Sequence, residues 1–398
     1  MSSGRTDYLT AKLQGFGTTI FTEMSALALA HDAVNLGQGF PDFPAPKALV
    51  SAAQDAMDAG HNQYAPGHGI PSLRQAITAH AARHYALDYD ADTEVTVTTG
   101  ATEAVFATIQ ALLDVGDEVV VFEPVYDVYP PAVAMAGGVV RAVQLRPDHK
   151  GVWRFDPSDL RAAVTAKTKA ILLNTPHNPT GKVFDTNELQ AIADIAITND
   201  VLVVTDEVYE HLTYDGVPHV PIATVDGMRE RTVRISSAGK TFSVTGWKVG
   251  WACAPAAVTD AIRAAKQWVT FTSGTPFQHG VAQALGWGAD YFDPLAQGYA
   301  NRRDRLSTGL TDLGFGVSPS NGSYFVMADI RPLGFDDDVD FCLRLPAQVG
   351  VAAIPVSGFH TDPRDGQGHV RFAFCKTDVL LEEGLQRLRA GMDAMPRA

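Results

Sequence analysis

The sequence predicts an α/β protein with a mostly parallel central sheet. Between about residues 92 and 255, short runs rich in valine, isoleucine and leucine alternate with longer stretches of helical periodicity. Strands covered by helices on both faces have this continuous apolar character, and the helices between them supply the crossovers that parallel strands need. We expect strands at 94–99, 118–122, 170–174, 201–205, 232–236 and 249–253.

After about residue 290 the pattern changes. A charged helix is expected at 301–313, strands at 323–328 and 368–374, and a closing helix at 378–392, which together indicate a smaller α+β domain. A chain of 398 residues is long enough for more than one domain. We therefore expect an N-terminal arm with part of the small domain (1–45), a large ligand-binding domain (46–290) and a C-terminal small domain (291–398).

The composition argues against several classes of function. A net charge of −14 without a clustered basic face argues against nucleic acid as a partner. No apolar run is long enough to span a bilayer, and residues 1–17 lack the pattern of a signal peptide, so no membrane partner is expected. The three cysteines are odd in number and far apart, which indicates free thiols in a reducing compartment; we expect a cytoplasmic protein.

Chemically useful residues follow five of the expected strands. Because ligands of open α/β sheets bind beyond the carboxyl ends of the strands, these residues are expected to meet at one site. The segments are Gly100-Ala-Thr-Glu103, Glu123-Pro-Val-Tyr126, Asn174-Thr-Pro-His-Asn-Pro-Thr-Gly181, Thr205-Asp-Glu-Val-Tyr209 and Ser236-Ser-Ala-Gly-Lys240. They offer backbone amides for a phosphate, an aromatic face, an amide side chain, a carboxylate with a phenol, and a lysine.

This set of groups suits pyridoxal phosphate. A lysine amine that condenses with an aldehyde must be neutral part of the time, which a desolvated pocket around Lys240 would allow. Asp206 is the candidate partner of the cofactor's pyridine nitrogen, which it would keep protonated so that the ring withdraws electrons. Tyr209 and Asn178 could hydrogen-bond the ring's phenolate oxygen, and Tyr126 could stack on the ring.

The phosphate of such a cofactor suits a helix N-terminus. The candidates are Ala101 and Thr102 at the start of the expected helix, supplemented by Ser237 and by the cation Lys248.

The segment Ser237-Ala-Gly-Lys240-Thr-Phe-Ser-Val-Thr-Gly246-Trp-Lys248-Val-Gly250 resembles the cofactor-lysine signature of the class I aminotransferases of pyridoxal-phosphate fold type I. Asn178-Pro-Thr-Gly181, Asp206-Glu-Val-Tyr209 and Asn35-Leu-Gly-Gln-Gly-Phe-Pro-Asp42 are similar to further motifs of that family, in the same order. The resemblance covers nearly the whole chain. It implies catalytic roles for Lys240, as Schiff base and proton shuttle, and for Asp206 and Tyr209.

The resemblance also implies how a substrate would be held. Arg371, in His369-Val-Arg-Phe-Ala-Phe374, matches the arginine that clamps the substrate α-carboxylate, a bidentate task that suits guanidinium. Gly39 and Asn178 would lie beside the substrate, and Phe21 matches an aromatic lid over it, although burial in the core is an alternative. Tyr64, in Asn62-Gln-Tyr64, matches a tyrosine that reaches the phosphate in the partner subunit, so a homodimer with shared active sites is implied.

The implied activity is a ping-pong transfer of an amino group between an amino acid and a 2-oxo acid. Residues 263–267, 276–278 and 350–355 look most like bacterial N-succinyldiaminopimelate aminotransferases of lysine biosynthesis, with 2-oxoglutarate as acceptor. Lys248 stands where many class I members have arginine, as it does in the kynurenine and glutamine transaminases. A kynurenine/glutamine/methionine-type aminotransferase and a carbon–sulfur β-lyase therefore remain alternatives. An aminotransferase-like sensor of transcription regulators is disfavoured, because the family-like segment begins within the first 40 residues.

No metal site is expected. His80 and His84 are four residues apart on an expected helix, but no third ligand is evident near them in the sequence, so they are interpreted as part of a surface helical face.

Overall fold

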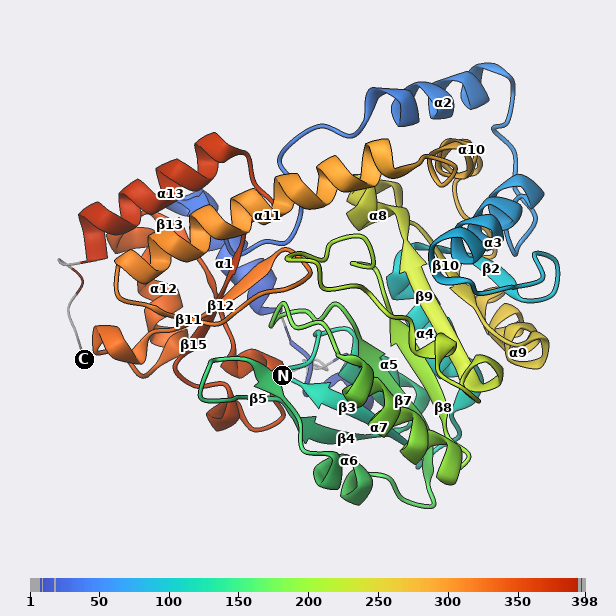
Figure 1. The fold of residues 1–398 in the computed structure, drawn as a ribbon, viewed down its shortest axis with the longest axis horizontal. Helices are drawn as coiled ribbons and strands as arrows, with labels where there is room; N and C mark the ends of the chain where they lie inside the picture. Colours follow the sequence, from blue (N-terminus) through green and yellow to red (C-terminus); the bar gives the residue numbers. More distant parts are fainter. Residues whose placement is uncertain (1–7, 9, 18, 393–394, 396–398) are drawn as a thin grey trace, which may run out of the picture.

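A seven-stranded sheet forms the centre of the larger part of the molecule. The computed structural model describes residues 8, 10–17, 19–392 and 395, so that part of the expected arm lies outside the described residues (Figure 1). The strands are β2 (Val95–Thr99), β3 (Glu118–Glu123), β4 (Val139–Gln144), β7 (Thr168–Asn174), β8 (Leu202–Asp206), β9 (Thr232–Ser237) and β10 (Val249–Cys253). Their order is β2-β10-β9-β8-β7-β3-β4, and every pair is parallel except those of β10 with β2 and β9.

The mostly parallel sheet confirms the predicted fold class. All of the strands expected between residues 94 and 253 are present in it, each within two residues of the expected bounds. The edge strand β4 was not predicted; Val143 is its only buried residue, so it lacks the continuous buried run of the inner strands.

Helices cover both faces of this sheet. Val119 and Val121 of β3 point into one apolar cluster, and Val120 and Phe122 into another, as the alternation of side chains along a strand requires. The first cluster includes α4 (Gly100–Leu112), α5 (Tyr129–Ala136) and α9 (Ala256–Lys266); the second includes α6 (Pro157–Ala163) and α7 (Thr186–Thr198). A third cluster packs α3 (Pro71–Tyr85) and α10 (Thr275–Ala284) on β2 and β10, and α2 (Lys47–Asp58) packs on α10.

The rest of the chain forms a smaller α+β part. Its antiparallel sheet has the order β11-β12-β15-β14, made of Gly316–Val317, Phe325–Asp329, His369–Ala373 and Ile354–Pro355. Helices α11 (Ala289–Asp312), α12 (Asp338–Gln348) and α13 (Asp378–Gly391) pack beside it (Figure 1). The helix expected at 301–313 is the second half of α11, which begins earlier because buried Phe292 and Tyr299 also face the core.

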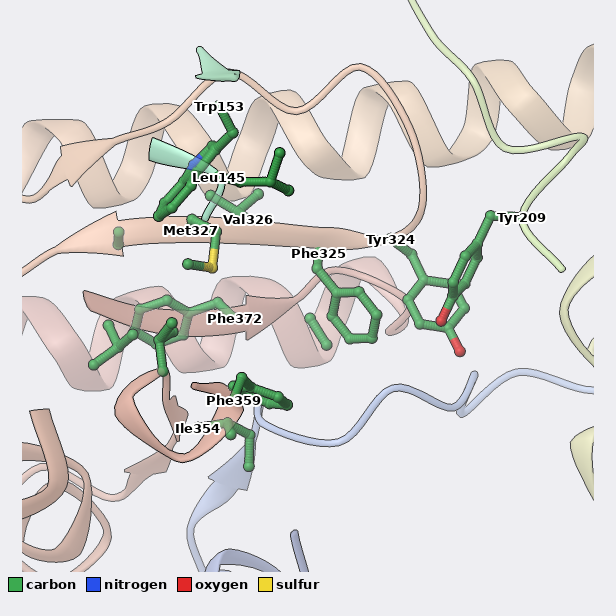
Figure 2. Packing of buried hydrophobic residues seen from close by; sticks show 14 of the residues in the cluster. Leu145, Trp153, Tyr209, Tyr324, Phe325, Val326, Met327, Ile354, Phe359 and Phe372 are labelled. Carbon is green, nitrogen blue, oxygen red and sulfur yellow. The ribbon is translucent and has the colours of Figure 1, made fainter. Parts of the chain in front are cut away.

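The N-terminal segment joins this smaller part. β1 (Val34–Asn35) pairs in parallel with β13 (Val351–Ala352), and α1 (Ile20–Ala30) packs against α12. A short hairpin, β5 (Arg146–Pro147) with β6 (Trp153–Arg154), reaches the small sheet, where the Trp153 indole N–H donates to Ser318 Oγ at 3.2 Å. Figure 2 shows Leu145 and Trp153 packed over Val326 and Met327 of β12, so one apolar cluster runs through both parts. The expected domain boundaries stay a prediction.

None of the helices in the described residues combines the length and the apolar character that a bilayer crossing requires.

Gly250 in β10 allows the N-terminus of α4 to lie directly on the sheet. A β-carbon at this position would be 2.5 Å from the carbonyl carbon of Gly100 and 2.6 Å from the amide nitrogen of Ala101. Both of these atoms belong to backbone, which cannot move aside as a flexible side chain could. The absence of a side chain at residue 250 therefore sets where the first turn of α4 begins.

We expect Gly250→Ala to lower the free energy of unfolding by about 1–3 kcal/mol, because the added methyl group overpacks the contact between β10 and α4. Gly246→Ala is the matched control, since a β-carbon there would meet nothing within 4 Å. Denaturant unfolding of both variants tests this, and an equal loss of stability in the two would contradict the assignment.

Candidate active site

A cavity of about 430 Å³ lies at the carboxyl ends of β7, β8 and β9, where the large sheet meets the small sheet. Twelve of the thirteen residues predicted to form the site line it: Phe21, Gly39, Ala101, Thr102, Tyr126, Asn178, Asp206, Tyr209, Ser237, Lys240, Lys248 and Arg371. The exception is Tyr64. Segments that are up to 350 residues apart in the sequence thus converge on one cavity, from Phe21 on α1 to Arg371 on β15.

Lys240 lies on α8 (Ala238–Thr241), the single helical turn that follows β9. Its Nζ is 2.7 Å from the hydroxyl of Tyr324 and 3.3 Å from the carbonyl oxygen of Gly39. Burial lowers the pKa of the amine to about 8, because the charged form is poorly solvated there. The nearby carboxyl of Asp206 opposes this effect but does not cancel it. In part of the molecules the Lys240 amine is therefore neutral near pH 7–8, and only the neutral amine is a nucleophile.

Asp206 ends β8 with its carboxyl group almost fully buried, at 5% exposure. Tyr129 donates its hydroxyl to Oδ2 at 2.8 Å, and the backbone N–H of Val208 donates to Oδ1 at 3.3 Å. Burial nevertheless raises the pKa of Asp206 to about 6, since these two hydrogen bonds only partly replace solvation. A cationic group placed in the cavity beside it would keep this carboxyl ionised.

Arg371 is a buried cation without an ion pair to any carboxylate of the described residues. Its guanidinium donates to Asn178 Oδ1 at 2.9 Å and to the carbonyl oxygen of Gly37 at 2.7 Å, while Nε has no partner. The rings of Phe325 and Phe21 lie 4.0 and 4.9 Å from the guanidinium carbon. Burial lowers its pKa to about 10. A buried charge left unpaired is costly, so this arrangement favours an anionic ligand.

The N-terminus of α4 provides a second site for an anion. Its first turn, Gly100 to Thr102, lines the cavity, and the backbone N–H groups there have no partner within the helix. A β-carbon on Gly100 would be 3.1 Å from Lys248 Nζ, which places the ammonium group directly over this turn. Ser237 lines the same end of the cavity. Unpaired amides, a helix dipole and a lysine are the groups that bind phosphate in proteins.

Tyr64 lies outside the cavity of its own chain. Its side chain is 83% exposed and meets the ring of Phe271 edge-on, with 5.6 Å between the ring centroids. Trp268, at 84% exposure, and Val269 are also exposed in the loop that carries Phe271. The structure of one chain therefore leaves Tyr64 on an apolar surface, where a second chain could meet it.

A buried ion network lies behind the turn that carries Asp206 and Tyr209. Arg234, on the neighbouring strand β9, donates Nε to Glu207 at 2.5 Å and also pairs with Glu210. His219 lies 3.0 Å from Glu207, and Ser236 donates to Glu210. In the chain, Glu207 directly follows Asp206 and Glu210 directly follows Tyr209. Because the ion network holds the two glutamates, it also fixes the positions of the two neighbouring cavity residues.

Several residues at the site were not predicted from the sequence. Tyr129 and Tyr324 contact Asp206 and Lys240, two of the residues predicted to be catalytic, and the carbonyl oxygen of Gly37 accepts a hydrogen bond from Arg371. Asp127 and Phe40 also line the cavity. Tyr129 comes only three residues after the predicted Tyr126, and it could have been considered as a buried phenol at the start of a helix. Tyr324 has no comparable local signal, because its partners are far away in the sequence.

The interpretation of His80 as part of a surface helical face is wrong, because its side chain is only 2% exposed and meets His211, a contact that the sequence did not reveal. His80 and His211 lie 2.8 Å apart through their Nε2 atoms, and their donor atoms and a Glu210 oxygen are all within 4.8 Å of one another. The carboxylate of Glu210 is already bound by Arg234 and Ser236. Arg83 brings a positive charge to both His80 and His84, which disfavours a cation at this place.

Comparisons with known proteins identify the family of this chain. Residues 31–388 match the family model described as aminotransferase class I and II. The probable N-succinyldiaminopimelate aminotransferase DapC of Mycobacterium tuberculosis is 51% identical over 387 residues, which span 95% of this chain and 97% of that protein. The methionine aminotransferase of Escherichia coli K12 is 41% identical, over 95% of this chain and 97% of the other.

A solved structure shows the same fold. The N-succinyldiaminopimelate aminotransferase from Mycobacterium tuberculosis superimposes with a TM-score of 0.93 at 50% identity, covering 96% of this chain and 99% of that one. The predicted family and the predicted enzyme class are thereby confirmed. This chain belongs to the class I and II aminotransferases and is an aminotransferase.

Proposed function

We propose that this aminotransferase binds pyridoxal phosphate in the cavity and uses Lys240 as its reactive amine. The observation that carries the proposal is the joint placement of Lys240, the buried Asp206 carboxyl and the N-terminus of α4 around one cavity. Class I aminotransferases use this cofactor. When bound, it supplies an aldehyde that takes up amino groups and a ring that withdraws electrons from the substrate.

The groups present fit each part of that cofactor. The amides of Ala101 and Thr102, with Ser237 and Lys248, would hold its phosphate. Asp206 would pair with its ring nitrogen, and a proton on that nitrogen would stabilise the buried carboxylate in turn. Two more side chains of the cavity, Tyr209 and Asn178, would donate to the phenolate oxygen, and Tyr126 would lie against the ring.

The chain's own residues then orient the substrate and move the proton. Arg371 would bind the α-carboxylate, which gives the buried guanidinium the anion it lacks. Asn178, already bonded to Arg371, would touch both substrate and cofactor. With its pKa lowered to about 8, Lys240 can take the proton from the substrate α-carbon as a base and return it as an acid. Phe21, stacked beside Arg371, would cover the substrate.

For the amino donor we propose N-succinyl-LL-2,6-diaminopimelate, with 2-oxoglutarate as acceptor. The support is the 51% identity to the Mycobacterium tuberculosis protein along nearly the full length of both chains. A methionine- or kynurenine-type donor is the second candidate, because the cavity has an aromatic lining of Phe21, Phe40, Tyr126 and Phe325. Among its described residues, the only cations are Lys240, Lys248 and Arg371, all of which have other proposed partners.

We also propose a homodimer in which Tyr64 completes the partner's phosphate site. Its exposure next to Trp268 and Phe271 supports this, since a tyrosine and a tryptophan so exposed are typical of an interface.

We expect Lys240→Ala to reduce the turnover number by several orders of magnitude, because acid–base catalysis by one positioned group is worth ~10²–10⁴ and the reactive amine is lost as well. The variant should keep its fold, since the lysine side chain lies in a cavity. Steady-state transamination and a thermal unfolding curve check both statements. Transamination close to the wild-type rate would end the proposal.

The donor assignment predicts that N-succinyl-LL-2,6-diaminopimelate has the highest kcat/KM in a panel with methionine, kynurenine and glutamine, each with 2-oxoglutarate or pyruvate as acceptor. A higher value for methionine or kynurenine would select the second candidate. An S-substituted cysteine without any 2-oxo acid is the control for β-lyase activity, whose products would be pyruvate and ammonia.

A mixture of Tyr64→Phe and Lys240→Ala subunits tests the shared site. In the heterodimer, one site combines an intact lysine with an intact tyrosine from the partner, and the other site carries both defects. Activity should therefore rise above that of either parent homodimer once the subunits exchange. If exchange is verified by mass and activity does not rise, Tyr64 does not act across the interface.

A further inference from the structure

Tyr324 stands between the reactive amine and the backbone of the N-terminal segment. Its side chain is fully buried just before β12, and its hydroxyl lies 2.7 Å from Lys240 Nζ and within hydrogen-bonding distance of the Gly39 carbonyl oxygen. Figure 2 shows its ring beside that of Tyr209, with 5.0 Å between the centroids in an edge-on arrangement. No role follows for Tyr324 from the proposed function alone.

The direction of the hydrogen bonds at this hydroxyl follows from counting protons. A phenol has one hydrogen, and the Gly39 carbonyl has none to give, so Tyr324 donates its hydrogen to Gly39. Toward Lys240 the same oxygen can then only accept. The amine donates one N–H to Tyr324 and a second to the Gly39 carbonyl at 3.3 Å.

This arrangement determines where the lone pair of the neutral amine points. A neutral amine has two N–H bonds and one lone pair. With both N–H bonds directed at Tyr324 and Gly39, the lone pair faces the cavity. There it can attack a carbonyl carbon or accept a proton. A hydroxyl that donated to the amine would have the opposite effect, because it would occupy the lone pair.

The packing around Tyr324 keeps this geometry in place. The rings of Phe325 and Tyr209 enclose it at centroid distances of 4.8 and 5.0 Å. A β-carbon on Gly39 would be 2.9 Å from the Tyr324 ring and 2.5 Å from that of Phe325, so only glycine lets this carbonyl come so close. This packing holds the Tyr324 hydroxyl and the Gly39 carbonyl in place, so neither group can follow the amine of Lys240 if the amine moves.

We propose that Tyr324 is a positioning residue for Lys240, which accepts an N–H from the amine and thereby directs its lone pair into the cavity. This inference rests on the proposed function of Lys240 as the reactive amine. Gly39 also contributes, because its backbone carbonyl accepts a hydrogen bond from the single hydroxyl hydrogen of Tyr324.

The experiment compares Tyr324→Phe with Tyr214→Phe in the full-length protein. Tyr214 is the matched control, because it is also buried, donates its hydroxyl to the backbone of Ser323 and does not line the cavity. The first measurement is made on protein freed of cofactor: a pulse of acetic anhydride at each pH from 6 to 10, followed by mass spectrometry of the peptide that contains Lys240. The pH at which labelling is half-maximal reports the ionisation of the amine.

Wild type and Tyr214→Phe should show this midpoint at the lowered pKa of Lys240, about 8. Tyr324→Phe removes an acceptor from the ammonium form, so its midpoint should fall by about one pH unit, the effect of one lost hydrogen bond to a charged group. A rise of the midpoint would mean that Tyr324 donates to the neutral amine and would overturn the proposal. So would a midpoint equal to that of Tyr214→Phe.

The second measurement is steady-state transamination by the loaded enzyme. Loss of orientation should lower kcat roughly 10- to 100-fold in Tyr324→Phe, with KM for the amino donor little changed. Tyr214→Phe should change neither constant. Failure of Lys240→Ala to lose activity would overturn the proposed function, whereas full activity of Tyr324→Phe in an enzyme that needs Lys240 would overturn this inference alone.

Discussion

The buried pairing of Arg234 with two glutamates is the constraint on which the site depends. Arg234, Glu207 and Glu210 are all at most 4% exposed. Two carboxylates and one guanidinium can be buried only if each finds a partner, since removal of one member of a buried ion pair costs ~3–5 kcal/mol. The network therefore permits very little freedom in the turn after β8, and the pKa of Glu210 is held well below its usual range mainly by Arg234, against the cost of burial.

The same turn is the place where the large sheet meets the rest of the chain. On its cavity side it presents Asp206 and Tyr209, and Tyr209 in turn packs against Tyr324, which directly precedes β12 of the small sheet. Arg371 makes a second connection of this kind, from β15 to Asn178 in the large part and to Gly37 in the N-terminal segment. The cavity thus lies at an interface between parts of the chain, and its geometry depends on how they pack.

The sequence was sufficient for the features that are local. The residues that follow a parallel strand lie at the carboxyl edge of the sheet, so the sequence alone assigns Ala101, Asp206 and Lys240 to one site. Arg234 and Tyr324 could not be assigned in this way. Arg234 lies in the middle of a fully buried strand and pairs with residues 24 and 27 positions away, and Tyr324 contacts Lys240 across 84 residues. The register between β8 and β9, which brings Arg234 level with Thr205, is a property of the packed sheet.

Burial acts on the charged groups of the cavity in one consistent way. It lowers the pKa of Lys240 to about 8 and that of Arg371 to about 10, and it raises that of Asp206 to about 6, so each is moved toward its neutral form. A ligand with a phosphate, a cationic ring nitrogen and a carboxylate would reverse the shifts at Asp206 and Arg371, because each would gain an opposite charge. Opposite charges on a ligand would therefore offset the cost of burying Asp206 and Arg371. Since ligands that bind only the folded state stabilise it, the proposed cofactor and substrate should contribute to the stability of the fold as well as to its chemistry.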